Sequence, residues 1–419
     1  MKFMWKYKLT FKAVSETLSF FVESENKELI EEFVYGFFEL FGDAKLKKIE
    51  THQINDDATK TKVIEFIEKF RGRFPPSLNQ VIAFFNHLEN NESFLFLPEI
   101  DLTVDVNYRL HNYLLSLKSN ESLESLNANF EKVYGNALKN YDILPNGTVR
   151  KFIGIKNLHV RKCRFCGLGQ LETEFKQTAH AISEGLGNKK VFLYEECDSC
   201  NEKFSRELEP DLINYFSIFR TFFDIKAKGG SKKLKGKEFE IANDGQPIIN
   251  FSSESHRPDP GDKSYILNLE LLDKVNTQDI YRCLSKFVLS VIDTKYIGSF
   301  KETIKWINKE ISIDTLPKIG ELISYNHFTK EPKLFVYIRK TDNMDFPFMV
   351  GEFHFTCKII TFIIPRSNKD DQKFIDKIEY QTFWKQFVHY NKPQNWAFND
   401  FSNDTERDLK FNLDFQLPK

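Results

Sequence analysis

The sequence has few of the features that mark membrane and secreted proteins. No apolar run approaches the roughly 18–20 residues that a membrane-spanning helix needs, and there are only 6 cysteines in 419 residues. Residues 1–21 interleave lysine with apolar residues and lack the continuous apolar core of a signal peptide. These absences predict a cytoplasmic protein that does not contact a membrane and keeps its cysteines reduced.

An excess of charge of either sign is also missing. Lysine and arginine number 59 and the acidic residues 60, which gives a net charge of −1. Nucleic acid, if it is the partner, must therefore be attracted by a local positive potential rather than by the whole chain. Low-complexity tracts are absent, and 41% hydrophobic residues in 419 allow two or three folded domains.

Three regions are predicted, which together make an α+β multidomain protein. Residues 1–150 mix strand-like and helical patterns without a chemical motif, residues 151–226 contain four of the cysteines, and residues 238–419 form an α+β accessory region. The lysine-rich, glycine-rich segment 226–237 is typical of a solvated linker or of a loop that follows a phosphate backbone.

Hydrophobic periodicity predicts the main elements of the flanking regions and the helix 211–225 that ends the middle region. Helices are expected at 27–41, 60–70, 78–88, 211–225, 277–292 and 372–389, with helical pieces over 110–138. Strands are expected at 2–22, 93–106, 319–325, 333–339 and 348–364, the last with a bend or hairpin inside it.

Two CxxC pairs stand at the centre of the chain, Cys163/Cys166 and Cys197/Cys200. In a reducing compartment, paired CxxC motifs indicate metal more than disulfides, and this spacing suits one tetrahedral four-thiolate zinc. Such a zinc has no open coordination position, so it would be structural. Isolated Cys283 and Cys357 lie in apolar segments, where we expect plain core residues.

The segment between and after the two pairs has a strand–turn–strand–helix pattern. A strand ends at His180, a glycine-rich turn follows at 185–188, and a second strand covers 190–194. Asn201 comes directly after Cys200, and the sequence NEKFSRELE continues as a helix. One zinc bound by both cysteine pairs would link the start of this unit to the beginning of its helix.

These motifs resemble the HNH endonuclease superfamily, and bacterial HNH endonucleases in particular. The resemblance is carried by CxxCG, AHAI, LGN and CxxCN followed by FSRELE, over residues 160–210. It implies a central ββα-metal module stapled by the four-cysteine zinc and flanked by N- and C-terminal α+β regions. It also implies an enzyme that hydrolyses phosphodiester bonds in DNA with Mg²⁺ or Mn²⁺ as the catalytic metal, with RNA as an open alternative.

The resemblance assigns roles to three residues. His180 takes the place of the general base, Asn201 that of the central asparagine, which binds the divalent metal or braces the loop, and Glu209 stands in for the last histidine as metal ligand. On one continuous helix Glu209 would share a face with Asn201, with Glu207 as the reserve. Asn201 as a mere helix N-cap and Glu209 as a solvated carboxylate are the alternatives.

One position departs from the family pattern. The family often has an acidic or histidine ligand before the general base, and here Ala179 occupies that place. The alternative function is therefore a non-catalytic, zinc-stabilised nucleic-acid-binding protein. Further hypotheses are a regulatory ligand or partner protein that gates the nuclease in bacterial defence or a mobile element, and a homodimer that cuts both strands.

Basic residues beside the motif are expected to contact phosphates. They are Arg161, Arg164, Lys189 and Lys190, together with Lys162.

Overall fold

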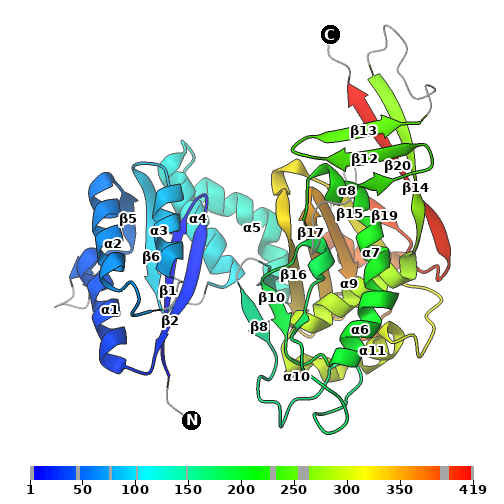
Figure 1. Cartoon of the computed structure of the whole chain (residues 1–419), viewed down its shortest axis with the longest axis horizontal. Helices are drawn as coiled ribbons and strands as arrows, with labels where there is room; N and C mark the ends of the chain where they lie inside the picture. The colour runs from blue at the N-terminus through cyan, green and yellow to red at the C-terminus, as the bar shows by residue number, and fades with distance from the viewer. Residues whose placement is uncertain are drawn as a thin grey trace. The chain divides into compact units, whose positions relative to one another are not determined.

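The computed structural model describes residues 4–43, 48–74, 78–100, 102–147, 150–226, 233–252, 264–386 and 396–416. It has a mixed α+β architecture, as predicted, in two compact units, Met1–Gly135 and Asn136–Lys419 (Figure 1). Within the described ranges no helix is long and apolar enough to cross a membrane.

The N-terminal unit is built on an antiparallel four-stranded sheet of order β2-β1-β6-β5. Its elements are β1 (Trp5–Ala13), β2 (Thr17–Ser24), α1 (Lys27–Leu40), β3 (Gly42–Asp43), β4 (Lys48–Ile49), β5 (His52–Asn55), α2 (Asp57–Lys69), α3 (Asn79–His87), β6 (Glu92–Pro98), α4 (Val104–Lys118) and α5 (Leu123–Asn140), which continues past the unit's end. Phenylalanine fills the core: the ring of Phe11 packs against those of Phe37, Phe85 and Phe96.

Two strand predictions in this unit are wrong in extent. Residues 2–22 do not form one strand, because β1 and β2 pair as a hairpin. The predicted strand 93–106 ends at Pro98, and α4 begins at Val104 with Thr103 as its N-cap. The helix predicted at 27–41 is confirmed as α1, which Asn26 caps.

The C-terminal unit contains a six-stranded sheet of order β19-β15-β18-β17-β16-β7. Its strands are β7 (Tyr141–Asn146), β15 (Ile319–Ile323), β16 (Thr329–Arg339), β17 (Met349–Thr356), β18 (Lys358–Ile363) and β19 (Trp396–Asn399). The predicted break inside 348–364 is confirmed as the β17–β18 hairpin, which turns at Thr356 with φ +52°.

The remaining elements of the unit surround this sheet. They are β8 (Lys151–Ile153), β9 (Ala179–His180), β10 (Val191–Leu193), α6 (Asp198–Glu207), α7 (Glu209–Tyr215), α8 (Ser217–Phe222), β11 (Leu234–Lys235), β12 (Phe239–Asn243), β13 (Pro247–Phe251), β14 (Ser264–Asn276), α9 (Thr277–Val291), α10 (Thr294–Ile297), α11 (Lys301–Ile307), α12 (Lys377–Gln386) and β20 (Glu406–Gln416), with 3₁₀ turns at Glu184–Leu186, Gly298–Phe300 and Tyr325–His327.

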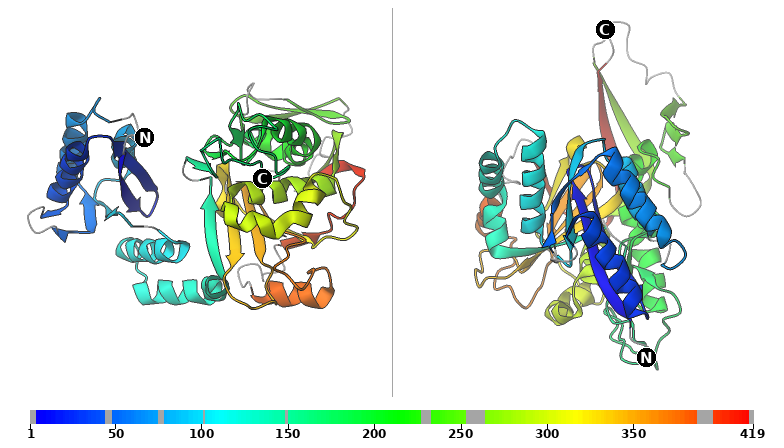
Figure 2. Two further views of the ribbon diagram at one scale, coloured as in Figure 1. Left: turned by 90° about the horizontal axis from the view of Figure 1, so that it is seen from below. Right: turned by 90° about the vertical axis from the view of Figure 1, so that its left-hand side faces the viewer.

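Both faces of the six-stranded sheet are buried. Along β16, Leu334 and Val336 belong to the core that contains α9, whereas Phe335 and Tyr337 face the core that contains Phe383 of α12. This alternation follows from the two-residue period of a strand. Helices α9 and α12 therefore cover opposite faces of the sheet (Figure 2).

The predicted boundary at 226–238 does not separate two cores. One hydrophobic cluster contains residues from the cysteine segment, such as Phe204 and Leu212, together with Phe287 of α9 and Phe353 of β17. The predicted regions 151–226 and 238–419 are thus parts of one compact unit that starts at Asn136. Periodicity within each segment could not reveal this, because it does not say which apolar faces meet.

The lysine-rich segment lies partly outside the described residues, since 227–232 are not among them. The described end of this segment, residues 233–237, includes a strand and forms ion pairs instead of being a solvated linker. Lys235 is in β11, Lys233 pairs with Glu240 at 2.7 Å, and Lys237 pairs with Glu270 at 2.6 Å.

Candidate metal centre and catalytic site

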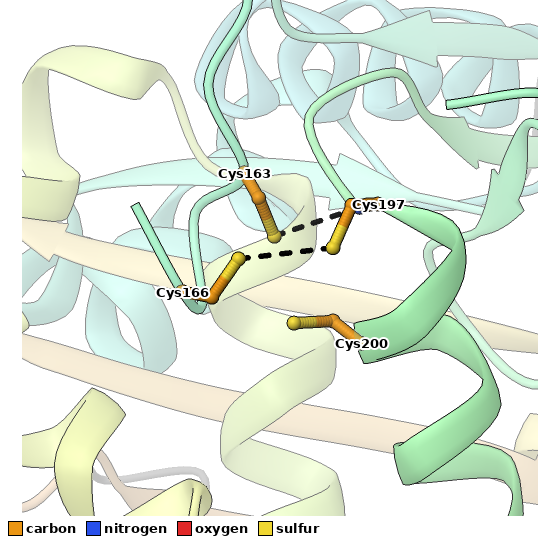
Figure 3. Close-up of side chains that lie close together, drawn as sticks. All are labelled: Cys163, Cys166, Cys197 and Cys200. Carbon is orange, nitrogen blue, oxygen red and sulfur yellow. Dashed lines mark hydrogen bonds between the residues drawn. The ribbon is translucent and has the colours of Figure 1, made fainter. Parts of the chain in front are cut away.

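The first cysteine pair lies in a tight turn. The backbone N–H of Cys163 donates to the carbonyl of Leu168, and that of Gly167 donates to the carbonyl of Cys163, both at 2.9 Å. Gly167 has φ +78°, in the left-handed region that glycine occupies without strain. The turn brings the sulfurs of Cys163 and Cys166 to one side of the chain (Figure 3).

The second pair opens helix α6. Cys197 is the N-cap residue and Cys200 lies in the first turn. Residues three apart on a helix lie on the same face, so both sulfurs point away from the helix in a similar direction. Figure 3 shows them facing the first pair, and the four sulfurs all lie within 4.8 Å of one another.

The geometry of the four sulfurs fits a zinc ion. Zinc–sulfur bonds of about 2.3 Å in a tetrahedron place the sulfurs roughly 3.8 Å apart, and the sulfurs of Cys166 and Cys197 are 3.7 Å apart. All four thiols are free rather than joined as disulfides. The prediction that these cysteines lie together in a metal-binding arrangement is confirmed, and four thiolates would leave zinc no open position.

The surroundings of Cys163 favour the thiolate form, which metal binding requires. A hydrogen bond from Cys200 and backbone N–H groups, among them that of Cys197, lower the pKa of Cys163 to about 5. Burial, by contrast, raises the pKa of Cys166 to about 12. A divalent cation among the sulfurs would favour the ionised form of all four.

His180 is on the short strand β9, which pairs antiparallel with β10 before α6 begins. The predicted order of strand, turn, strand and helix is therefore observed. The imidazole packs on Phe192 with ring centroids 4.8 Å apart, and its Nδ1 is buried with no hydrogen-bond partner among the described residues. Its Nε2 lies 3.9 Å from a carboxylate oxygen of Glu184. Burial lowers the pKa of His180, although Glu184 and Glu209 act in the opposite direction.

Asn201 follows the last cysteine inside α6 and is half-buried. The N-cap alternative is wrong, because Cys197 occupies that position and the N–H of Asn201 donates to the carbonyl of Cys197 within the helix. Its side chain makes no hydrogen bond with the described residues, so the amide is available to a ligand.

Glu209 is not on the same helix as Asn201. Helix α6 ends at Glu207, Leu208 leaves the helical region with φ −122°, and Glu209 begins α7. Pro210 explains the break, since proline has no N–H to continue the hydrogen bonding of α6. The argument that Asn201 and Glu209 share a helix face therefore fails, and Glu207 is exposed on α6.

The carboxylate of Glu209 has partners within the protein. Ser183, three residues after His180, donates its hydroxyl to one oxygen at 2.5 Å, and the ammonium of Lys286 lies 3.9 Å from the other. The side chain of Glu209 is 14% exposed. This arrangement suits a brace for the loop behind His180 better than a metal ligand.

Lys286 is a site residue that the sequence did not reveal. It lies on α9, wholly buried, and pairs with the equally buried Glu196 at 3.1 Å. Burial raises the pKa of Glu196 to about 7, and for Lys286 the effect of burial is outweighed by Glu196 and Glu209, which raise its pKa. No motif marks Lys286, because it is far from the cysteines in the sequence.

Two of the predicted phosphate contacts are structural. Arg164 is buried, binds Glu195 at 2.6 Å and donates to the carbonyls of Leu289 and Ile292 at the end of α9. A cation there is favoured by the helix dipole. Arg161 is 9% exposed and donates to the carbonyl of Ile155 at 2.9 Å. Neither guanidinium is available to a phosphate in this arrangement.

The lysines of the turn remain at the surface. Lys190 pairs with Glu331 of β16 at 2.6 Å. Lys189 and Lys162 are exposed and form no ion pair with the described residues. Of the five predicted phosphate contacts, Lys162 and Lys189 thus remain as exposed cations without an ion pair among the described residues.

Comparison of the chain with family models, with curated proteins and with solved structures finds no match.

Proposed function

We propose that the chain is a metal-dependent HNH endonuclease that hydrolyses phosphodiester bonds in DNA. The observation that supports this best is the setting of His180, on a β9–β10 strand pair followed by α6, whose first turn is held by the cysteine cluster. The HNH resemblance leads us to expect this order of elements around a general base.

His180 has the properties that a general base needs. Its lowered pKa keeps the imidazole neutral near pH 7, so it can accept a proton. In the proposed step, Nε2 takes a proton from water, and the resulting hydroxide attacks the scissile phosphate. Packing on Phe192 fixes the ring, and Glu184 beside Nε2 stabilises the imidazolium that forms.

The proposal includes Mg²⁺ or Mn²⁺, which would stabilise charge on the phosphate and on the leaving 3′ oxygen. Glu209 does not fit as a ligand, because Ser183 and Lys286 engage its oxygens. Among the described residues the four cysteines are the only group of three or more His, Cys, Asp or Glu side chains close enough for a metal. Of the predicted ligands of this metal, Asn201 remains, so water and substrate phosphate would have to complete the shell.

Cleavage of supercoiled plasmid by the zinc-loaded full chain with Mg²⁺ or Mn²⁺ tests the proposal. We expect His180→Ala to lower the rate by about 10²–10⁴-fold, the usual contribution of a general base. His159→Ala is the matched control, because His159 is an exposed histidine of the same segment. Equal rates for wild type and His180→Ala would refute the proposed role of His180.

A second candidate function is a zinc-stabilised nucleic-acid-binding protein without catalysis. Buried Ala179 precedes His180 where the family often has a metal ligand, and Glu209 is engaged elsewhere. DNA binding in a gel-shift experiment, combined with no cleavage under any divalent metal, would favour this alternative.

A further inference from the structure

An open depression lies on the face of the six-stranded sheet that α12 covers. It is bounded by α12, by β19 and by the segment leading into β15, and its volume is about 640 Å³. Sites for small molecules and cofactors commonly measure roughly 300–1,000 Å³. The depression is therefore large enough for a ligand of the size of a nucleotide.

Aromatic rings form its floor. The rings of Tyr380, Trp384 and Phe398 pack around one another, with centroids 5.7 Å apart for Tyr380–Trp384, 5.2 Å for Trp384–Phe398 and 5.9 Å for Tyr380–Phe398. Tyr380 is fixed by its hydroxyl, which donates to the carbonyl of Lys318 at 3.2 Å. Tyr380 and Phe398 are half-buried, so each side chain keeps some exposed surface beside the depression.

Positive charge lines the rim. Lys318, Lys377 and Lys385 are all exposed, and none forms an ion pair with the described residues. The acidic residue in the lining is Asp400, one oxygen of which accepts the N–H of Ser402 at 2.8 Å. The rim is thus net positive beside an aromatic floor.

We propose that this depression binds a nucleotide unit. A base has a π-face that stacks on aromatic rings, and its phosphate is attracted by lysine ammonium groups. A free nucleotide and one nucleotide of a single strand share this chemistry. The inference goes beyond the nuclease proposal and does not depend on it. The depression lies beside β15, whereas Lys190 of the His180 segment pairs with Glu331 of β16. Strands β18 and β17 separate β15 from β16 in the sheet.

Isothermal titration of the full zinc-loaded chain carrying His180→Ala tests the inference without cleavage of the probe. The probes are adenosine 5′-monophosphate and a short oligothymidylate, with adenosine and inorganic phosphate as partial ligands. The pocket variant combines Lys318→Gln, Lys377→Gln and Lys385→Gln. Its matched control combines Lys295→Gln, Lys301→Gln and Lys369→Gln, three exposed lysines outside the depression.

We expect the pocket variant to bind a nucleotide probe about tenfold more weakly than the control variant, with the same melting temperature because the substituted side chains are exposed. Loss with the monophosphate identifies a free nucleotide as the ligand, and loss with the oligonucleotide alone identifies a single strand. Equal affinity of both variants, no binding of either probe to the parent chain, or adenosine bound as tightly as its monophosphate would overturn the inference.

Discussion

His180 illustrates how a residue's surroundings adapt it to one protonation state. Its imidazole is partly buried and packs on Phe192, and this burial favours the neutral form. The neighbouring Glu184 favours the protonated form but does not reverse the shift. The sequence identified the residue, whereas its pKa depends on contacts that only the folded chain provides.

The lowered pKa of His180 leads to a prediction about pH. Protonated imidazole cannot accept a proton, so cleavage should fall as the pH drops through the pKa of His180. Because that pKa lies below the ordinary 6.5, we expect the acid midpoint of the rate below pH 6.5. Initial plasmid-cleavage rates between about pH 5 and pH 8 measure it, and a midpoint above 6.5 would contradict a buried, neutral His180.

The role of Lys286 also depends on contacts that only the folded chain provides. Both it and Glu196 are almost fully buried, and each would be an uncompensated charge without the other. Glu209 adds a second carboxylate near the same ammonium. The pair links the segment before the second cysteine pair to α9.

We therefore expect Lys286→Met to lower the free energy of unfolding by about 3–5 kcal/mol, the usual effect of removing one partner of a buried ion pair. Denaturant unfolding measures this, with exposed Lys305→Met as control. Adding Glu196→Gln should recover part of the loss, because the fully buried carboxylate of Glu196 is then no longer left without its cation. A double variant as unstable as the sum of the two single variants would show that the residues do not act as a pair.

At the scale of elements, the cysteine cluster joins a turn to a helix. Gly167 allows the turn, and Cys197 and Cys200 bring the start of α6 to it. Few backbone hydrogen bonds connect these short pieces, apart from contacts such as Arg164 N–H to the carbonyl of Glu195 at 2.9 Å. A metal ion among the sulfurs would therefore contribute much of the local stability.

We expect the purified chain to contain one zinc ion, and Cys200→Ser to lose it. Loss of zinc should lower the free energy of unfolding by several kcal/mol, because binding energy of a structural zinc is folding energy. Zinc content by mass spectrometry and denaturant unfolding measure the two effects. Cys357→Ala is the control, since Cys357 is a buried cysteine outside the cluster. Equal zinc content in both variants would contradict the assignment.

At the scale of the whole molecule, the cysteine segment is embedded in the C-terminal unit. Phe204 of α6 and Leu212 of α7 lie in the same core as Phe287 of α9 and Phe353 of β17. The segment alone would expose these faces to water, which costs a free energy of about 25 cal/mol for each Å² of apolar surface.

Fragments of the chain test this organisation. We expect residues 151–226 alone to remain unfolded, whereas residues 121–419, which keep α5 whole, should unfold cooperatively and retain zinc. Circular dichroism during denaturation and zinc content distinguish the outcomes. A folded, zinc-binding 151–226 fragment would show that the shared core is not needed.

The sequence by itself predicted the mixed α+β class, the cysteine quartet, the strand–turn–strand–helix order around His180, and several helices, among them α1. These depend on local patterns: metal-ligand spacing, glycine in turns and the 3.6-residue period of a helix. The same locality explains the errors at 2–22 and 93–106, where a hairpin and a helix start interrupt an apolar stretch.

Only the tertiary structure decided how these pieces are used. In the folded chain Arg161 and Arg164 are buried. Glu209 accepts a hydrogen bond from Ser183 and lies near Lys286, and Lys286 pairs with Glu196. Each of these contacts joins segments that no spacing rule connects, because burial and charge pairing depend on which faces meet in space. The nucleotide-sized depression on α12 arises in the same way, from side chains of α12, β19 and the segment before β15.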